Sequence, residues 1–203
     1  MARRVLITGS EGHLGRALRA AFEAEGDGVI GVDLPGTGAD HECALDSLST
    51  TGYAALPTGY DVVICNAKCA TWHAHEYLAR QARSSIINIG SIYGSLGSDP
   101  QLYTDTDVPP TPSWYAASKG ALLALTKWEA TNLAPVRANM VSPGGIFRDH
   151  ADSFRERYEA KVPLKRMATE ADIVPLVLFL ADPIRAAYIT GAIIPVDGGY
   201  SAW

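Results

Sequence analysis

The sequence predicts an α/β fold with a single doubly wound parallel sheet, and two observations carry this prediction. Short apolar runs typical of buried parallel strands alternate along the chain with stretches of helical periodicity. A glycine-rich turn joins the first apolar run directly to a helical stretch. The 203 residues, of which 47% are hydrophobic and 19% charged, are expected to form one globular domain over residues 1–203.

The predicted elements follow from local patterns. Apolar runs predict six strands, at residues 3–7, 29–33, 61–65, 85–89, 137–141 and 192–196. Periodicity predicts helices from residue 14, over 115–133 and over 169–181, with Thr169 as the N-cap of the last. A compact helix and a brief strand are expected between residues 33 and 61, and one helix near residues 73–83.

Composition limits the class of protein. A net charge of -5 argues against binding to nucleic acid or to an anionic membrane, and no apolar stretch is long enough to cross a bilayer. The three cysteines lack the paired spacing of a zinc site, so we expect no metal and reduced thiols in a cytoplasmic protein.

The glycine-rich turn predicts a dinucleotide site. Gly9 allows a tight turn, Gly12 removes a Cβ where backbone would approach a pyrophosphate, and Gly15 lets the helix pack on the sheet. The helix N-terminus then offers free N–H groups to phosphates. Three further residues of the turn are expected against the cofactor: Glu11, His13 and Leu14. The His13 side chain either bonds a phosphate or points into solvent.

Asp33 ends the second predicted strand and favours NAD over NADP. Its carboxylate can accept hydrogen bonds from both adenosine ribose hydroxyls. It would repel a 2'-phosphate by about 4 kcal/mol at 4 Å and an effective dielectric near 20. No lysine or arginine follows at once to offset this charge, since the next residues are Leu34, Pro35 and Gly36.

Tyr115 and Lys119 are predicted to share one face of a helix, one turn apart. Lowering the pKa of a phenol by about three units takes about 4 kcal/mol, which a nearby ammonium can supply in a shielded site. Ser91 follows the strand at 85–89 and can hold a substrate oxygen. These three residues are the predicted catalytic groups for hydride transfer at a hydroxyl or carbonyl carbon.

An ordered set of motifs along essentially the whole chain resembles the short-chain dehydrogenase/reductase family. The set comprises Thr8 to Gly15, Asp33, Asn66-Ala67, Ser91, Tyr115 to Lys119, Pro143-Gly144 and Val196 to Gly199. The resemblance implies a Rossmann fold, an NAD-dependent enzyme and a small-molecule substrate. It also implies further cofactor contacts by Tyr115, by Lys119 on the nicotinamide ribose, and by Asp46, Asn66, Ala67, Pro143, Gly144 and Ile146.

A narrower resemblance is to a sugar-modification branch of this family that is associated with flagellin glycans and nonulosonic-acid pathways. The motifs that carry it are Ser91 to Gly94, the insert from Leu102 to Pro110, Ser142 to Phe147 and Val162 to Thr169. It implies an amino-sugar or nucleotide-sugar substrate. Substrate loops are expected at residues 95–113, where Pro, Asp, Thr and Gly cluster, and at residues 145–165. The candidate substrate contacts are Lys68, Tyr93, Tyr103, Gly145 and Phe147. Apolar residues on a second face of the helix at 115–133, with Trp128 among them, favour a homo-oligomer, either a dimer or a tetramer.

The chain departs from the family pattern in several ways, one of which is the separation of Ser91 and Tyr115 by about 24 positions, with the extra residues in the loop at 95–113. Gly12 stands one place early, a spacing that resembles the extended members of the family. The segments after residues 33 and 66 are short, so the fold is expected to be shortened. No asparagine lies between Asn66 and Asn88, where the family carries a proton-relay asparagine. Two alternatives therefore stay open: a nucleotide-sugar epimerase or dehydratase, and an NAD-binding scaffold with impaired catalysis.

Overall fold

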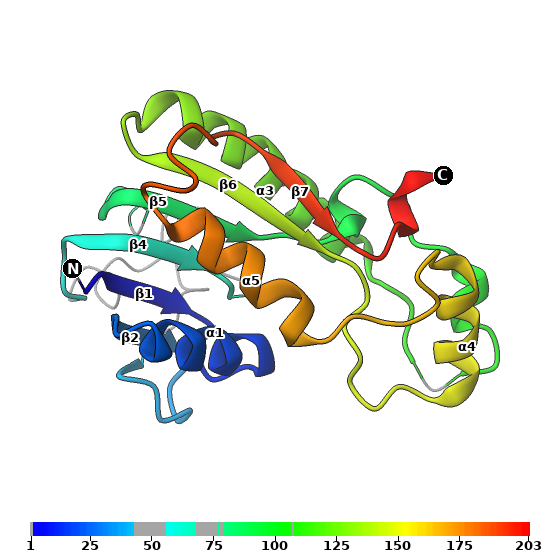
Figure 1. Ribbon diagram of the computed structural model, residues 1–203. Coiled ribbons are helices and arrows are strands. Elements are labelled where there is room, and N and C mark those ends of the chain that lie inside the picture. Colours follow the sequence, from blue (N-terminus) through cyan, green and yellow to red (C-terminus); the bar gives the residue numbers. More distant parts are fainter. Residues whose placement is uncertain (1, 43–55, 68–76, 78, 107) are drawn as a thin grey trace.

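The structure is a computed structural model that describes residues 2–42, 56–67, 77, 79–106 and 108–203 (Figure 1). In this part of the chain, seven strands form one sheet in the order β3-β2-β1-β4-β5-β6-β7, and every neighbouring pair is parallel. The strands are β1 (Arg4–Thr8), β2 (Gly28–Asp33), β3 (His41–Glu42), β4 (Tyr60–Cys65), β5 (Ala82–Ile89), β6 (Arg137–Pro143) and β7 (Ile193–Val196). This arrangement confirms the predicted Rossmann-like α/β fold.

Helices cover both faces of the sheet. Helices α1 (His13–Ala24) and α5 (Glu170–Ala181) lie on one face, and α3 (Ser113–Asn132) lies on the other, while α4 (Asp152–Lys161) stands beyond one end of the strands (Figure 1). Three short 3-10 helices complete the described elements: η2 (Ile92–Gly94), η3 (Pro100–Tyr103) and η4 (Tyr200–Ala202).

The central strands are apolar on both sides because each side has its own core. Consecutive residues of β1 show this: Leu6 packs in the cluster on the α3 face, and Ile7 packs in the cluster on the α1 and α5 face. In β5, Ile86 likewise packs on the α3 face, and Ile87 packs on the α1 and α5 face. Side chains of a strand alternate between faces, so a sheet covered on both faces needs continuous apolar runs. The predicted strands agree with the observed ones to within a few residues.

Helix α5 begins where the sequence predicts. The Thr169 side chain and the Asp172 carboxylate form a capping box, in which Asp172 accepts from the Thr169 amide at 2.8 Å. A capping box satisfies backbone donors that the first helical turn leaves free. Helix α1 buries Leu14, Leu18 and Phe22, the apolar stripe expected from its periodicity.

The predicted loops contain more regular structure than expected. The segment 95–113 includes η3, and the segment 145–165 includes the ten-residue helix α4. Helix α4 buries only Phe154 and Tyr158, one turn apart, so its apolar pattern was too sparse to indicate a helix. The brief strand expected after residue 33 is β3. The helix expected near residues 73–83 lies partly outside the described residues, and its last two residues, Ala82 and Arg83, belong to strand β5 instead.

The strands all point toward α4, so the carboxyl ends of β1, β4, β5 and β6 share one edge (Figure 1). An isolated β-bridge between Ile146 and Ala168 joins the two ends of the segment that contains α4. Ligands bind at this edge in open α/β sheets. Among the described helices, none combines the length and the apolar character needed to span a bilayer.

Candidate active site

A cavity of about 920 Å³ lies along the carboxyl edge of the sheet. It extends from the glycine-rich turn after β1 to the helix α4, and residues from the ends of β1, β2, β4, β5 and β6 line it. A volume of this size suits a ligand larger than a single small metabolite.

The turn between β1 and α1 forms the floor of one end. Gly9 has a φ of +66°, a conformation that side chains disfavour, and its amide bonds the Val32 carbonyl at 2.8 Å. A Cβ on Gly15 would lie 2.1 Å from the Gly9 carbonyl oxygen, so only glycine lets α1 start this close to the turn. Gly12 is the N-cap of α1 and has no side-chain cap, so the helix N-terminus faces the cavity with free amides.

Asp33 lies beside this turn at the end of β2. Its carboxylate accepts from the Glu11 amide and from the Leu34 amide, both at 2.8 Å. These two bonds fix the carboxylate at the rim of the cavity, where it contributes a negative charge. The position fits the ribose-binding acid that the sequence predicts.

Asn66 and Ala67 support the turn from the end of β4. The Asn66 side-chain amide donates to the Gly9 carbonyl at 3.0 Å. The backbone amides of Asn66 and Ala67 both donate to the Thr8 hydroxyl, at 3.0 and 3.1 Å. Both residues line the cavity, and Asn66 therefore also holds the Gly9 turn in place.

Ser91 lies just after β5, where it caps η2. Its hydroxyl oxygen accepts from the Tyr93 amide at 3.2 Å, and the residue is buried at the cavity wall. Because the amide occupies an acceptor position, the hydroxyl hydrogen is left to bond a ligand oxygen. This is the role that the sequence predicts for Ser91.

Tyr115 and Lys119 occupy the first turns of α3 and face the same cavity. The Lys119 ammonium donates to the Ile89 carbonyl at 2.8 Å and lies 5.8 Å from the centre of the Tyr115 ring. Lys119 is 6% exposed, so its charge acts through little water. The geometry thus brings together the serine, phenol and ammonium that the sequence places on separate elements.

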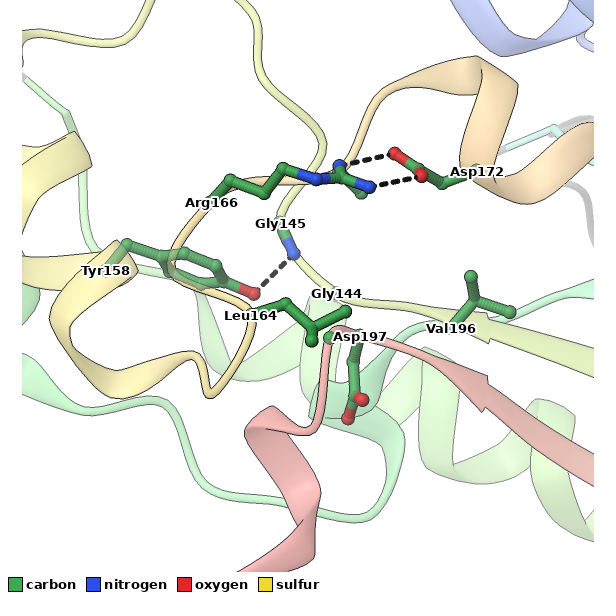
Figure 2. Close-up of a pocket in the computed structure, with 10 residues that line it drawn as sticks. Gly144, Gly145, Tyr158, Leu164, Arg166, Asp172, Val196 and Asp197 are labelled. Carbon is green, nitrogen blue, oxygen red and sulfur yellow. Dashed lines mark hydrogen bonds and ion pairs between the residues drawn. The ribbon is translucent and has the colours of Figure 1, made fainter.

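The turn after β6 closes the middle of the cavity with Pro143, Gly144, Gly145 and Ile146. Figure 2 shows the Tyr158 hydroxyl directed at the Gly145 amide, from which it accepts a hydrogen bond at 2.5 Å. A Cβ on Gly145 would lie 2.8 Å from the Tyr158 ring, so the two glycines allow α4 to approach the turn.

Behind this turn lies a second, smaller cavity of about 140 Å³. It is bordered by Tyr158 and by the ion pair of Arg166 and Asp172, whose bonds measure 2.6 and 2.7 Å (Figure 2). That ion pair and a backbone amide hold the pKa of Asp172 well below its usual range. The two charged groups are therefore paired with each other, and the cavity that they border is too small for a cofactor.

The structure brings most predicted residues to the large cavity. Those that line it are Gly9, Gly12, His13, Leu14, Asp33, Asn66, Ala67, Ser91, Tyr93, Tyr103, Tyr115, Lys119, Pro143, Gly144, Gly145 and Ile146. Three do not line it: Gly15 packs on the turn itself, the Glu11 side chain bonds Ser10, and Phe147 packs near His150. Asp46 and Lys68 lie outside the described residues.

One wall of the cavity contains residues that are not among the predicted site residues: Val108 to Pro112, Arg148, His150, Phe154, Tyr158 and Met167. All of them except Met167 come from the two segments that were predicted as substrate loops. The Phe154 and Tyr158 pair, spaced by one helical turn, was the available signal for α4.

Comparison with known proteins identifies the family to which this chain belongs. A family model described as enoyl-(acyl carrier protein) reductase matches residues 62–201. The chain is also 31% identical over 194 residues to a galactitol 2-dehydrogenase (L-tagatose-forming) of Cereibacter sphaeroides, a match that covers 90% of this chain and 71% of the relative. The chain belongs to the short-chain dehydrogenase/reductase family. It is an oxidoreductase of that family.

Other members of the short-chain dehydrogenase/reductase family agree with this assignment. A D-arabinitol 2-dehydrogenase (ribulose-forming) of Scheffersomyces stipitis is 32% identical over 140 residues, covering 64% of this chain and 47% of the relative. This chain therefore spans about half of that relative's length. A short-chain dehydrogenase structure from Leptospira borgpetersenii with bound NAD+ superposes with a TM-score of 0.76 at 25% identity, covering 99% of this chain and 93% of that one.

The close packing of η2 on α3 is expected to be essential for the catalytic geometry. Replacing Gly94 by alanine places a Cβ 2.7 Å from the Lys119 carbonyl oxygen, so η2 and Ser91 must move away from α3. Such overpacking costs about 1–3 kcal/mol. We expect Gly94→Ala to lower the free energy of unfolding in urea by this amount and to reduce turnover.

The matched control is Gly97→Ala, whose added Cβ meets no atom within 4 Å. It should leave both the urea midpoint and turnover unchanged. Wild-type behaviour of Gly94→Ala would show that the spacing between η2 and α3 does not matter.

Proposed function

We propose that this chain is an NAD-dependent oxidoreductase that interconverts a secondary alcohol and its ketone. One observation carries the proposal: a continuous cavity has the glycine-rich turn and Asp33 at one end, and Ser91, Tyr115 and Lys119 beyond it. Short-chain dehydrogenase/reductase membership supports the same reaction class. The carbohydrate-like substrate suggested by the sequence, an amino sugar or nucleotide sugar, and the polyols in the names of its relatives both carry such an alcohol.

The cavity fits a dinucleotide. Free amides at the start of α1 can bind phosphates, Gly12 leaves room for them, and Asp33 can accept from ribose hydroxyls. Pro143, Gly144 and Ile146 would then border the nicotinamide, and Lys119 would bind its ribose. When bound, the nicotinamide supplies the hydride acceptor or donor.

The protein residues then handle the proton. Ser91 donates a hydrogen bond to the substrate oxygen and orients it. The Tyr115 hydroxyl gives or takes the proton of that oxygen, and the Lys119 ammonium stabilises the phenolate form. Since Lys119 is buried, its effect on Tyr115 is stronger than it would be in water.

The first test is Tyr115→Phe. Removing the acid/base hydroxyl should lower kcat/KM by at least about a hundredfold, while the Kd of NADH stays within about twofold of wild type. Turnover is followed by NADH absorbance and binding by NADH fluorescence. Tyr188→Phe is the control, because that side chain is fully exposed and should leave both values unchanged.

This test also separates the two alternatives. A scaffold protein would bind NADH and show no Tyr115-dependent turnover of any alcohol or ketone. An epimerase or dehydratase would convert a nucleotide sugar with no net change in NADH absorbance. Either result would replace the proposed reaction.

The second test concerns cofactor choice. We expect wild type to bind NADH at least about tenfold more tightly than NADPH, because the Asp33 carboxylate repels a 2'-phosphate. Asp33→Asn keeps the side-chain shape and should reduce the preference for NADH, measured as the Kd of NADPH divided by the Kd of NADH. The surface variant Asp152→Asn should leave the ratio unchanged, and tighter NADPH than NADH binding by wild type would contradict the assignment.

We also propose that a second copy of the chain packs against α3. An exposed apolar stripe runs along this helix: Trp114, Ala117, Ala121, Ala124 and Trp128. The stripe is nearly symmetric about Ala121, so an antiparallel two-fold crossing would set each Trp114 near the Trp128 of the other copy. A self-complementary patch of this kind is what a two-fold dimer requires.

The third test is the oligomeric state in solution. Ala121→Arg places a charge at the centre of the stripe and should convert a dimer or tetramer to a smaller species, measured by light scattering after size exclusion. Ala187→Arg, at another exposed alanine, should leave the mass unchanged. A monomeric wild type would contradict this proposal.

A further inference from the structure

Three tyrosine side chains line the far end of the large cavity, beyond Ser91. Tyr93 comes from η2, Tyr103 from η3 and Tyr158 from α4. A fourth ring, Tyr200 of η4, stacks behind Tyr158 at 5.1 Å without lining the cavity. Segments far apart in the sequence therefore bring several tyrosine side chains to the place where a substrate would lie.

The hydrogen bonds already present leave these hydroxyls able to bond a further partner, since Tyr93 is bonded to the neighbouring Tyr103 side chain and each phenol oxygen has two lone pairs. The Tyr158 oxygen accepts from the Gly145 amide, so its own hydrogen is left for another acceptor. The hydroxyls of Tyr103 and Thr111 lie 2.7 Å apart, and one donates to the other. The accepting partner of this pair keeps its hydrogen, and both keep lone pairs.

Burial keeps these groups neutral. It raises the pKa of Tyr158 to about 12, and burial beside Tyr103 raises the pKa of Tyr93 above its ordinary value. Both therefore remain protonated at neutral pH and act as donors and acceptors without charge. A hydroxyl of this kind matches another hydroxyl, which also donates and accepts.

Aromatic faces stand between the hydroxyls. The Phe154 ring lies 5.5 Å from that of Tyr103 and 6.2 Å from that of Tyr158, and His150 stacks on it at 5.1 Å. Phe154 and His150 line the cavity as well. Apolar faces with a few placed polar groups suit a ligand that has both C–H surface and hydroxyls.

The charges around this end are balanced. Among the described residues that line the cavity, the carboxylate is that of Asp33, at the nucleotide end. Arg148 is paired with Glu170 at 2.6 Å, and burial lowers the pKa of His150, so its imidazole is neutral at pH 7. This end therefore offers no net charge to a substrate.

We propose that Tyr93, Tyr103 and Tyr158 bind the hydroxyl groups of a neutral, polyhydroxylated substrate, a polyol or its ketose. The inference rests on the proposed oxidoreductase function and adds the class of substrate. It disfavours acyl thioesters, whose long apolar chains cannot use three hydroxyl partners. It also disfavours sugar acids and phosphates, which need a free cation.

The experiment compares two alcohols of equal chain length, galactitol and 2-hexanol, with NAD+ as oxidant and NADH absorbance as the signal. Wild type should oxidise galactitol with the higher kcat/KM. Tyr93→Phe and Tyr103→Phe should each raise the KM for galactitol about threefold to tenfold, the loss of one net hydrogen bond, with little change in kcat. Neither variant should change kcat/KM for 2-hexanol.

Tyr188→Phe is the matched control, since the same change is made at a fully exposed side chain that does not line the cavity. It should leave the galactitol KM unchanged. An unchanged galactitol KM in both cavity variants, or an equal loss with both alcohols, would overturn the inference.

The substrate panel separates this inference from the proposed function. Tyr115-dependent turnover of 2-hexanol, or of an acetoacetyl thioester, in preference to galactitol and D-arabinitol would overturn the hydroxyl subsite and leave the oxidoreductase function standing. No turnover of any alcohol or ketone with NAD or NADP would overturn both.

Discussion

The hydrogen bond from the buried Lys119 ammonium to the Ile89 carbonyl organises the catalytic end of the molecule. A buried ammonium is costly unless it is hydrogen-bonded, so this contact fixes helix α3 against the end of β5. Tyr115 then lies one turn earlier on the same helix, and Ser91 lies two residues beyond Ile89 on the other partner. One polar contact between two elements thus sets the positions of the proposed catalytic groups.

The parallel sheet supplies the second constraint. Because its strands end at a common edge, the turn after β1, the acid at the end of β2 and the serine after β5 share one cavity although they are far apart in the sequence. The two ends of this cavity differ in character. The end proposed to bind the nucleotide has free amides and a carboxylate, while the far end has neutral phenols and aromatic faces. The same edge can therefore hold a charged cofactor and a neutral substrate side by side.

Several features were predictable because they depend on local sequence. Continuous apolar runs indicated the doubly covered strands, and Thr169 followed by Asp172 indicated the start of α5. The glycine spacing and Asp33 indicated residues that line one end of the cavity, since a turn and a strand end determine both positions. The spacing of Tyr115 and Lys119 placed both on one helical face.

The far wall of the cavity was not predictable from such patterns. Tyr158 matters because it meets Gly145 across thirteen residues, and Tyr103 matters because η3 packs beside α4. These contacts arise from tertiary packing of segments whose own periodicity is weak, such as α4 with only two buried side chains. The narrower resemblance to a sugar-modification branch also rested on short motifs in and near those segments. The similar proteins do not confirm that branch.

In the proposed complex, a phenol and an ammonium on α3 face a nicotinamide whose nucleotide is anchored at the turn after β1. A crystal structure of the chain with NAD+ tests this most directly. We predict that the pyrophosphate lies on the amides of the Gly9 to Leu14 turn, that the adenosine ribose bonds Asp33, and that the nicotinamide C4 faces the Tyr115 hydroxyl. A nucleotide bound elsewhere, or a Tyr115 hydroxyl directed away from C4, would contradict the account.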